Sequence, residues 1–214
     1  MPERLLPMFP LGTVLFPGAL LPLHVFEERY RALVADCLAG ARCFGVVLIE
    51  RGSEVGGGDQ RVGVGTEAHI EAARSFDDGR WAVIARGVRR IEVAEWVGEA
   101  PYPCAAVCEA PDTEDDIDEL SLEGAAQAVR RVRALASELG HATSTDHLDV
   151  GDEAAARPDD DVGGGGAALW RLCDMAPLTA FDRQRLLEAP GHRARAALLT
   201  ELAVALGDDL GGLQ

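Results

Sequence analysis

The segment LFPGALLPLHVFEERY, residues 15–30, decides how the first half of this chain folds. It opens with the turn signal Pro17-Gly18, continues as an apolar run from Leu20 to Phe26, and then changes to a helical pattern. Pro22 lies inside the apolar run and cannot donate a hydrogen bond to a neighbouring strand. The segment therefore predicts a strand at a sheet edge or barrel corner, followed directly by a helix.

The helix is expected over residues 27–38, with Gly40 as its end. Charged residues fill one side of this stretch, and apolar residues recur at helical spacing on the other. The predicted apolar stripe consists of Phe26, Tyr30, Leu33, Val34 and Cys37.

The rest of the first 110 residues reads as strands. Asp77-Asp78-Gly79 is a hairpin turn, and Gly87 lies in the middle of a long strand, where it predicts a bend or bulge. Residues 51–60 hold four glycines and predict an exposed loop. Together with short strands within residues 5–26, the predicted strands cover residues 43–50, 61–76, 81–97 and 102–109. The total is about six strands and one helix.

After Pro111 the pattern becomes helical. A helix is expected to begin in the acidic segment 112–119 and to end at Gly140, with an apolar stripe formed by Leu122, Ala126, Val129, Val132 or Arg133, Ala136 and Leu139. Further helices are predicted at 167–175, 182–188 and 193–206. The polar, acidic and glycine-rich stretch 141–166 predicts a flexible insertion, and 207–214 a frayed tail. The fold class is α+β, with a β-rich domain at 1–110 and a helical bundle at 111–206.

Composition excludes several functions. The chain of 214 residues carries 36 Asp and Glu against 20 Arg, a net charge of −16, and contains no Lys. It therefore has no Walker-A lysine, no Schiff-base lysine and no Ser-Lys dyad. The negative charge predicts no binding to nucleic acid or to an anionic membrane, and no apolar run is long enough to span a bilayer. Five cysteines without CxxC spacing favour a reduced, cytoplasmic chain.

Seven short motifs, taken in their order and spacing, resemble the N-terminal domain of the Lon protease. The first five span the β-rich half and the last two the helical half. They are Leu6–Leu11, Leu15–Gly18, Leu21–Tyr30, Val64-Gly65-Thr66, Gly87–Arg90, Ala176-Pro177-Leu178 and Arg183–Glu188.

The resemblance implies a PUA-like β-barrel followed by a helical bundle. It also implies a stand-alone substrate-binding module, because the chain has no room for the ATPase and peptidase of Lon. The expected function is non-enzymatic recognition of unfolded or extended polypeptides, in protein quality control or as an adaptor, with an ATP-dependent protease as a possible partner. No cofactor and no metal are expected.

The candidate peptide-binding residues are Phe16, Leu20, Leu23, Phe26, Tyr30, Arg89 and Arg90. The apolar members could dock an extended peptide on the edge strand, although large apolar side chains are usually core residues. The arginines, together with Arg86, could hold a carboxylate. The simpler interpretation is pairing with nearby acidic residues, namely Glu92, Glu95 or Glu99.

Two alternatives stay open. One is a small-molecule hydrolase or thiol enzyme with an unrecognised Cys-His pair, although Cys104 and Cys108 alternate with Ala106 in a strand and are expected to be small buried residues. The other is a ligand-sensing adaptor. His141, Asp146, His147 and Asp149 could collect a metal ion, but their spacing matches no structural zinc site and predicts a solvated loop instead.

Overall fold

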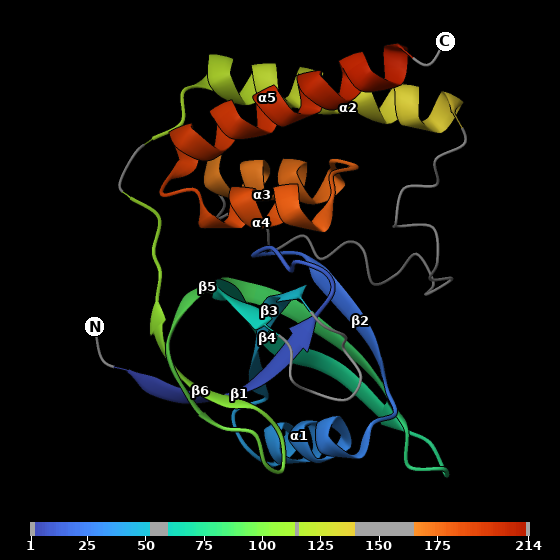
Figure 1. Ribbon diagram of the computed structural model, residues 1–214, viewed down its shortest axis with the longest axis vertical. Coiled ribbons are helices and arrows are strands. Elements are labelled where there is room, and N and C mark those ends of the chain that lie inside the picture. The colour runs from blue at the N-terminus through green and yellow to red at the C-terminus, as the bar shows by residue number, and fades with distance from the viewer. Residues whose placement is uncertain (1–2, 52–59, 114–115, 140–164, 213–214) are drawn as a thin grey trace. The chain divides into compact units, whose positions relative to one another are not determined.

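Six strands and five helices make up the described part of the chain in our computed structural model, which covers residues 3–51, 60–113, 116–139 and 165–212 (Figure 1). The chain separates into two compact units, Met1–Pro111 and Asp112–Gln214. The first holds all six strands and one helix, and the second holds four helices. The predicted α+β fold is confirmed.

The strands of the first unit form one mixed sheet that closes on itself. Their order is β2-β5-β4-β3-β1-β6, and β6 also pairs with β5. Only β1 and β3 run parallel; the other pairs are antiparallel. The bounds are Arg4–Leu11 for β1, Leu20–Val25 for β2, Cys43–Arg51 for β3, Gln60–Ser75 for β4, Trp81–Gly98 for β5 and Cys104–Glu109 for β6.

Strand β5 is long enough to take part in two different pairings. Its first part pairs with β2, and its second part, from Ile91, pairs with β6 and so closes the barrel. The pairing with β4 shifts register between Ala68 opposite Gly87 and Glu67 opposite Arg89, which makes Val88 an extra residue on β5. This β-bulge confirms the irregularity predicted at Gly87. Strand β2 lies outside the closed ring, because among the described strands it pairs with β5 alone.

Two apolar cores hold the first unit together. The smaller core lies inside the barrel and is built around Met8 and Ile91. The larger one lies between the sheet and helix α1, Glu28–Ala39, where the ring of Tyr30 stacks on Phe9 with centroids 4.0 Å apart. Four members of the predicted stripe are buried, but Phe26 is 59% exposed, because it lies between β2 and α1 and belongs to neither element.

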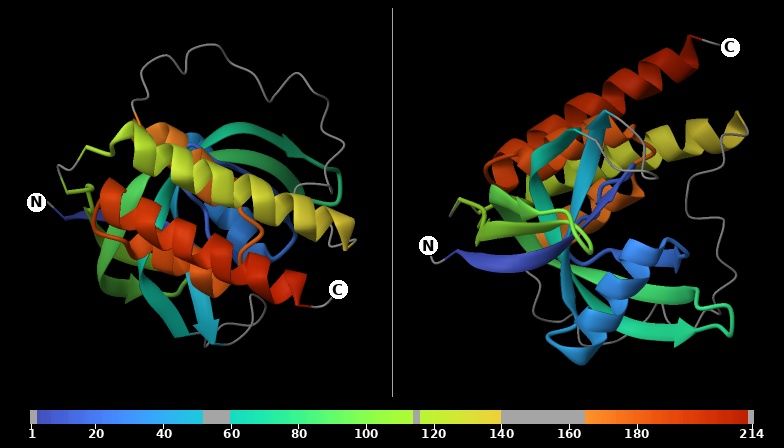
Figure 2. Two further views of the ribbon diagram at one scale, coloured as in Figure 1. Left: turned by 90° about the horizontal axis from the view of Figure 1, so that it is seen from above. Right: turned by 60° about the horizontal axis from the view of Figure 1, so that its bottom comes forward.

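The second unit consists of helices α2, Glu119–Glu138, α3, Gly165–Met175, α4, Ala180–Glu188, and α5, His192–Gly211. Helices α2 and α5 lie side by side in both views of Figure 2. The side chains of Asp118 and Thr179 accept hydrogen bonds from backbone amides in the first turns of α2 and α4, which fixes where these helices begin.

Two expectations for this unit need correction. The segment from residue 207 was predicted to fray, but α5 continues to Gly211, since Leu210 is buried and a Cβ atom placed on Gly207 would lie 3.9 Å from the side chain of Leu135 on α2. The predicted insertion reached residue 166, whereas α3 already begins at Gly165. The rest of that insertion, with Gly140, lies outside the described residues, as does most of the predicted 51–60 loop.

Candidate functional site

The candidate site is the outer edge of β2. This strand pairs with the first part of β5, Leu20 opposite Arg86 through Val25 opposite Trp81, and no other described strand pairs with its far side. The edge position predicted from Pro22 is therefore confirmed. An open edge presents unpaired backbone groups that can bind an additional extended strand.

A turn fixes where this edge begins. Gly18 has a φ of 83°, which favours glycine, and its amide donates to the carbonyl of Gly87 at 2.8 Å. The guanidinium of Arg86 donates to the carbonyl of Gly18 at 2.9 Å and pairs with Glu71 at 2.5 Å. The start of β2 is thus attached to the middle of β5 by backbone and side-chain bonds together.

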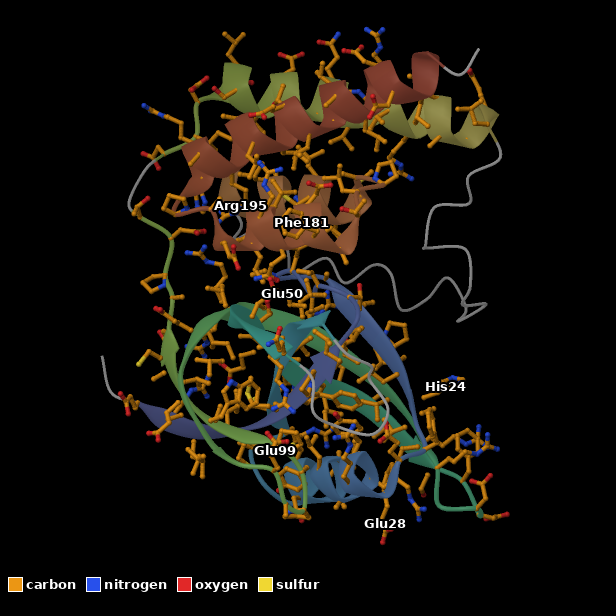
Figure 3. The ribbon with its side chains drawn as sticks, in the orientation of Figure 1. His24, Glu28, Glu50, Glu99, Phe181 and Arg195 are labelled. Carbon is orange, nitrogen blue, oxygen red and sulfur yellow. The ribbon has the colours of Figure 1, made fainter. Side chains whose placement is uncertain are left out.

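The side chains of β2 alternate between the core and the surface. Leu21 and Val25 are buried in the larger core, and Leu23 is partly buried against it. Leu20, 38% exposed, and Pro22 lie on the other face. His24 lies on that face as well, on the outer side of the strand (Figure 3). Exposed Phe26 follows directly, so apolar side chains lie at both ends of the open edge.

Two of the expected peptide-binding residues lie in the core instead. Phe16 is fully buried, and Tyr30 is buried in its stack with Phe9. Neither side chain is accessible to a peptide at the surface. Of the apolar candidates, Leu20, Leu23 and Phe26 remain at the surface or partly at it.

The arginine candidates are engaged elsewhere in the barrel unit. Arg90 is buried and donates to the carbonyls of Ala110 and Pro111, both at 3.1 Å. Arg89 pairs with Glu109 and, at 3.0 Å, with Glu67. The acidic partners of Arg86 and Arg89 are Glu71, Glu67 and Glu109. The predicted partners Glu92, Glu95 and Glu99 were wrong. They follow the bulge on the same strand, and the register puts other residues opposite the arginines.

Glu67 is a buried carboxylate that the sequence did not single out. It receives hydrogen bonds from Arg4 and from the thiol of Cys43, in addition to the pair with Arg89. Burial alone would raise the pKa of Glu67, but the two guanidiniums outweigh it and lower the pKa below its ordinary value. Glu67 thus remains charged and joins β1, β3 and β5. The signal in the sequence is one acidic residue within an otherwise small and apolar stretch, GVGTEAHI.

The helical unit has a comparable residue in Arg195, whose side chain is fully buried. It donates to Asp112 at 2.6 and 3.1 Å and to the carbonyls of Leu186 and Ala189, and its guanidinium lies 3.7 Å from the ring centroid of Trp170. These contacts join α3, the end of α4 and the start of α5 to the residue that opens the unit. Arg195 is a structural residue.

The cysteines give the thiol-enzyme alternative no support. Register puts Cys43 opposite His69, but the thiol of Cys43 bonds to Glu67, and burial together with that carboxylate raises its pKa. Burial also raises the pKa of Cys104, and it raises the pKa of Cys37 and Cys173 to about 12. A reactive cysteine needs a lowered pKa. The expected burial of Cys104 and Cys108 needs correction, since Ala105 and Val107 are the buried residues of β6.

The described residues contain no group of three or more His, Cys, Asp or Glu side chains that could hold a metal ion. The four residues considered for a metal, at 141, 146, 147 and 149, lie outside the described ranges. Among the helices that the structure describes, none has the length and apolar character needed to cross a bilayer.

Proteins of a known family are similar to this chain in sequence. Residues 5–205 match the model of the ATP-dependent protease La (LON) substrate-binding domain. The Lon protease of Anaeromyxobacter dehalogenans is 30% identical over 203 residues, which cover 92% of this chain and 22% of that protein. The Lon protease of Flavobacterium johnsoniae is 35% identical over 113 residues, 52% of this chain and 14% of that protein. This chain thus spans less than a quarter of the length of these two curated relatives.

Solved structures agree. A Lon N-terminal domain protein from Xanthomonas campestris has a TM-score of 0.61 at 28% identity, covering 92% of this chain and 97% of that one. The N-terminal domain of a Mycobacterium avium complex Lon protease has a TM-score of 0.60 at 17% identity and supports the fold alone; it covers 96% and 99%. On the family match and these likenesses together, the chain belongs to the Lon substrate-binding domain family.

Proposed function

We propose that this chain is a non-enzymatic recognition module that binds unfolded or extended polypeptides, and that the open edge of β2 is where it binds them. The observation that carries the proposal is a strand edge that no other described strand pairs with, with exposed Leu20 at one end and exposed Phe26 at the other. Backbone pairing makes such binding tolerant of sequence, and the flanking apolar side chains add a preference for apolar segments.

The binding site that we propose is narrower than the set of residues expected from the sequence. It includes Leu20, Leu23 and Phe26, and it leaves out Phe16 and Tyr30, which are buried. Arg89 and Arg90 are left out too, because both have partners within the barrel unit. We expect modest affinity, since one short edge offers few backbone bonds against the cost of ordering a flexible peptide.

The broader role that we propose is in protein quality control or as an adaptor that presents polypeptides to an ATP-dependent protease. The family name, with its reference to substrate binding, supports this role. All five cysteines are free, which suits our proposal that the protein works in the reducing cytoplasm. Co-purification of the intact chain with a stoichiometric ATP-dependent protease would support the adaptor role, and a lone chain in cell extract would count against it.

A matched pair of variants tests the site. Phe26→Ser removes an apolar side chain at the edge, and Val97→Ser removes one of similar exposure, 57% against 59%, from the opposite end of β5. Fluorescence anisotropy with a labelled, unstructured apolar peptide should show weaker binding by Phe26→Ser, by about 5- to 30-fold, as expected for losing one buried apolar contact. Val97→Ser should bind like the wild type. Equal binding by all three proteins would contradict the proposed site.

A further inference from the structure

We propose that Pro22 makes the edge of β2 selective: it disfavours pairing with a second copy of this chain and leaves the edge open to an extended, apolar and basic segment of another polypeptide. This inference rests on the proposed function, since it states which class of polypeptide that edge accepts. It is carried by three observations on β2, namely the direction of its backbone groups, the position of its proline and the charge of the chain.

The direction of the backbone groups follows from the pairing with β5. Just before β2, the carbonyl of Ala19 accepts a hydrogen bond from the amide of Gly87 at 2.9 Å. Because alternate residues of an antiparallel strand bond to the same neighbour, Leu21, Leu23 and Val25 direct their backbone groups toward β5. The residues between them, which are Leu20, Pro22 and His24, direct theirs toward the open edge.

Pro22 is thus the central residue of the open edge, and it brings a carbonyl acceptor without an amide donor. A foreign strand with an ordinary residue opposite Pro22 loses one backbone bond and keeps the other, donating its own amide to the Pro22 carbonyl. A second copy of this chain pairing through β2 brings its own Pro22. Each copy then lacks a donor, so two bonds are lost in any register that includes both prolines.

The net charge of the chain also disfavours pairing with a second copy. Each chain carries a net charge of −16, so two copies repel each other. Within residues 1–111 there are 15 Asp and Glu against 11 Arg, so the unit that carries β2 is itself acidic. Charge complementarity therefore favours an occupant with Arg or Lys beside its apolar residues, and it disfavours acidic polypeptides.

Two variants test the role of the proline. Pro22→Val restores the missing donor at the edge, and Pro17→Val adds a donor outside the β2 ladder as a control. At equal concentration, sedimentation velocity should show a larger weight-average mass for Pro22→Val than for the wild type, while Pro17→Val should match the wild type. Pro22→Val should also bind a basic apolar peptide about 2- to 10-fold tighter, the effect of one added net hydrogen bond.

The outcomes separate this inference from the proposed function. If the wild type binds the peptide but Pro22→Val neither self-associates nor binds more tightly, the selective role of Pro22 is wrong and the proposed function stands. If the wild type binds no peptide and Pro22→Val still self-associates, the proposed function fails, and the discrimination against a second copy stands. An acidic apolar peptide that binds as tightly as the basic one would overturn the preference for basic segments.

The wild-type chain provides a test that does not depend on the folding of a variant. In residue-resolved hydrogen exchange without peptide, the amides of Leu20 and His24 should exchange rapidly, and those of Leu21, Leu23 and Val25 should be protected. Addition of the basic peptide should protect Leu20 and His24. The reverse alternation, or protection of Leu20 and His24 in the free chain, would show that the edge is oriented differently or already covered and would overturn the inference.

Discussion

Gly87 determines the path of β5 because another segment of backbone passes directly beside it. A Cβ atom at this position would overlap the carbonyl oxygen of Phe16, while the amide and carbonyl of Gly87 bond to Ala19 and Gly18. The same residue thus allows the bulge in β5 and anchors the turn that leads into β2. The geometry of the open edge depends on this one position.

Replacing Gly87 with Ala should therefore destabilise the chain. We expect a loss of about 1–3 kcal/mol in the free energy of unfolding, the usual cost of forcing an atom into a packed site. Gly63→Ala is the matched control, since nothing lies within 4 Å of a Cβ added there on β4. Urea denaturation monitored by tryptophan fluorescence measures both. Equal midpoints for the two variants would show that the close approach at Gly87 is not required.

Glu67 leads to a prediction about pH. Its pKa is lowered from an ordinary 4.5 in the folded chain, so its charged form stabilises the fold above that pH, and the stabilisation is lost as the pH falls through the lowered value. Glu67→Gln should cost about 1–3 kcal/mol at pH 7, because the carboxamide keeps one acceptor oxygen but loses the charge opposite Arg4 and Arg89.

The measurement is the difference in unfolding free energy between wild type and variant at several pH values. It should be largest near neutral pH and should shrink as the pH falls from 4.5 through the lowered pKa of Glu67, where the wild-type carboxyl also becomes protonated. Glu92→Gln, at an exposed position on β5, should change stability by less than about 0.5 kcal/mol throughout. A Glu67→Gln effect of constant size across this pH range would contradict a charged Glu67.

At the scale of elements, α5 depends on a charge buried at its first turns. Arg195 bonds to Asp112 and to the carbonyls of Leu186 and Ala189, so it joins the start of α5 to the C-terminal end of α4. Arg195→Met should cost about 3–5 kcal/mol, because the largely buried carboxylate of Asp112 loses the guanidinium that donates to both of its oxygens. Arg130→Met, at an exposed position on α2, is the control and should have little effect.

Thermal unfolding followed by circular dichroism at 222 nm compares these two variants. Adding Asp112→Asn to Arg195→Met should restore part of the lost stability, because the carboxylate that was left without its arginine is then neutral. An Arg195→Met variant that melts with the wild type, or a double variant no more stable than the single one, would contradict this role for the pair.

The elements were largely predictable because their signals are local. Pro22, the hairpin at Gly79 and the apolar stripe of α1 each depend on a few neighbouring residues. The first two predictions are confirmed, and the stripe is confirmed except for the exposed Phe26. The length of α5 was not predictable, because residues 207–211 become helical through packing on α2 rather than through their own propensity. The phase of β6 was misjudged for a similar reason: burial of Ala105 and Val107 depends on the barrel.

The candidate site was predictable only in part. Position on an edge follows from Pro22, and a surface role for Leu20 follows from its alternation with Leu21. The burial of Phe16 and Tyr30 depends on contacts between segments distant in the sequence, as does the capture of Arg89 by Glu67. Residues of these types can serve either a core or a site, and tertiary packing decides which.

For the whole molecule, charge is distributed unevenly between the two units. Residues 112–214 carry 21 Asp and Glu against 9 Arg, whereas residues 1–111 carry 15 against 11. A chain with this charge should attract basic polypeptides over a distance and should do so less strongly as salt screens the field. We propose that recognition by the intact protein combines this long-range charge preference with short-range pairing at the β2 edge.

The most direct test of this claim is a titration of the intact, ¹⁵N-labelled chain with an unstructured polypeptide that carries apolar and basic residues, followed by NMR. We predict that the largest amide shift changes fall within residues 18–26 and on the paired part of β5, Trp81–Arg86, and that added salt weakens them. Shift changes confined to other surfaces, or none at millimolar peptide across several sequences, would contradict polypeptide recognition at the β2 edge.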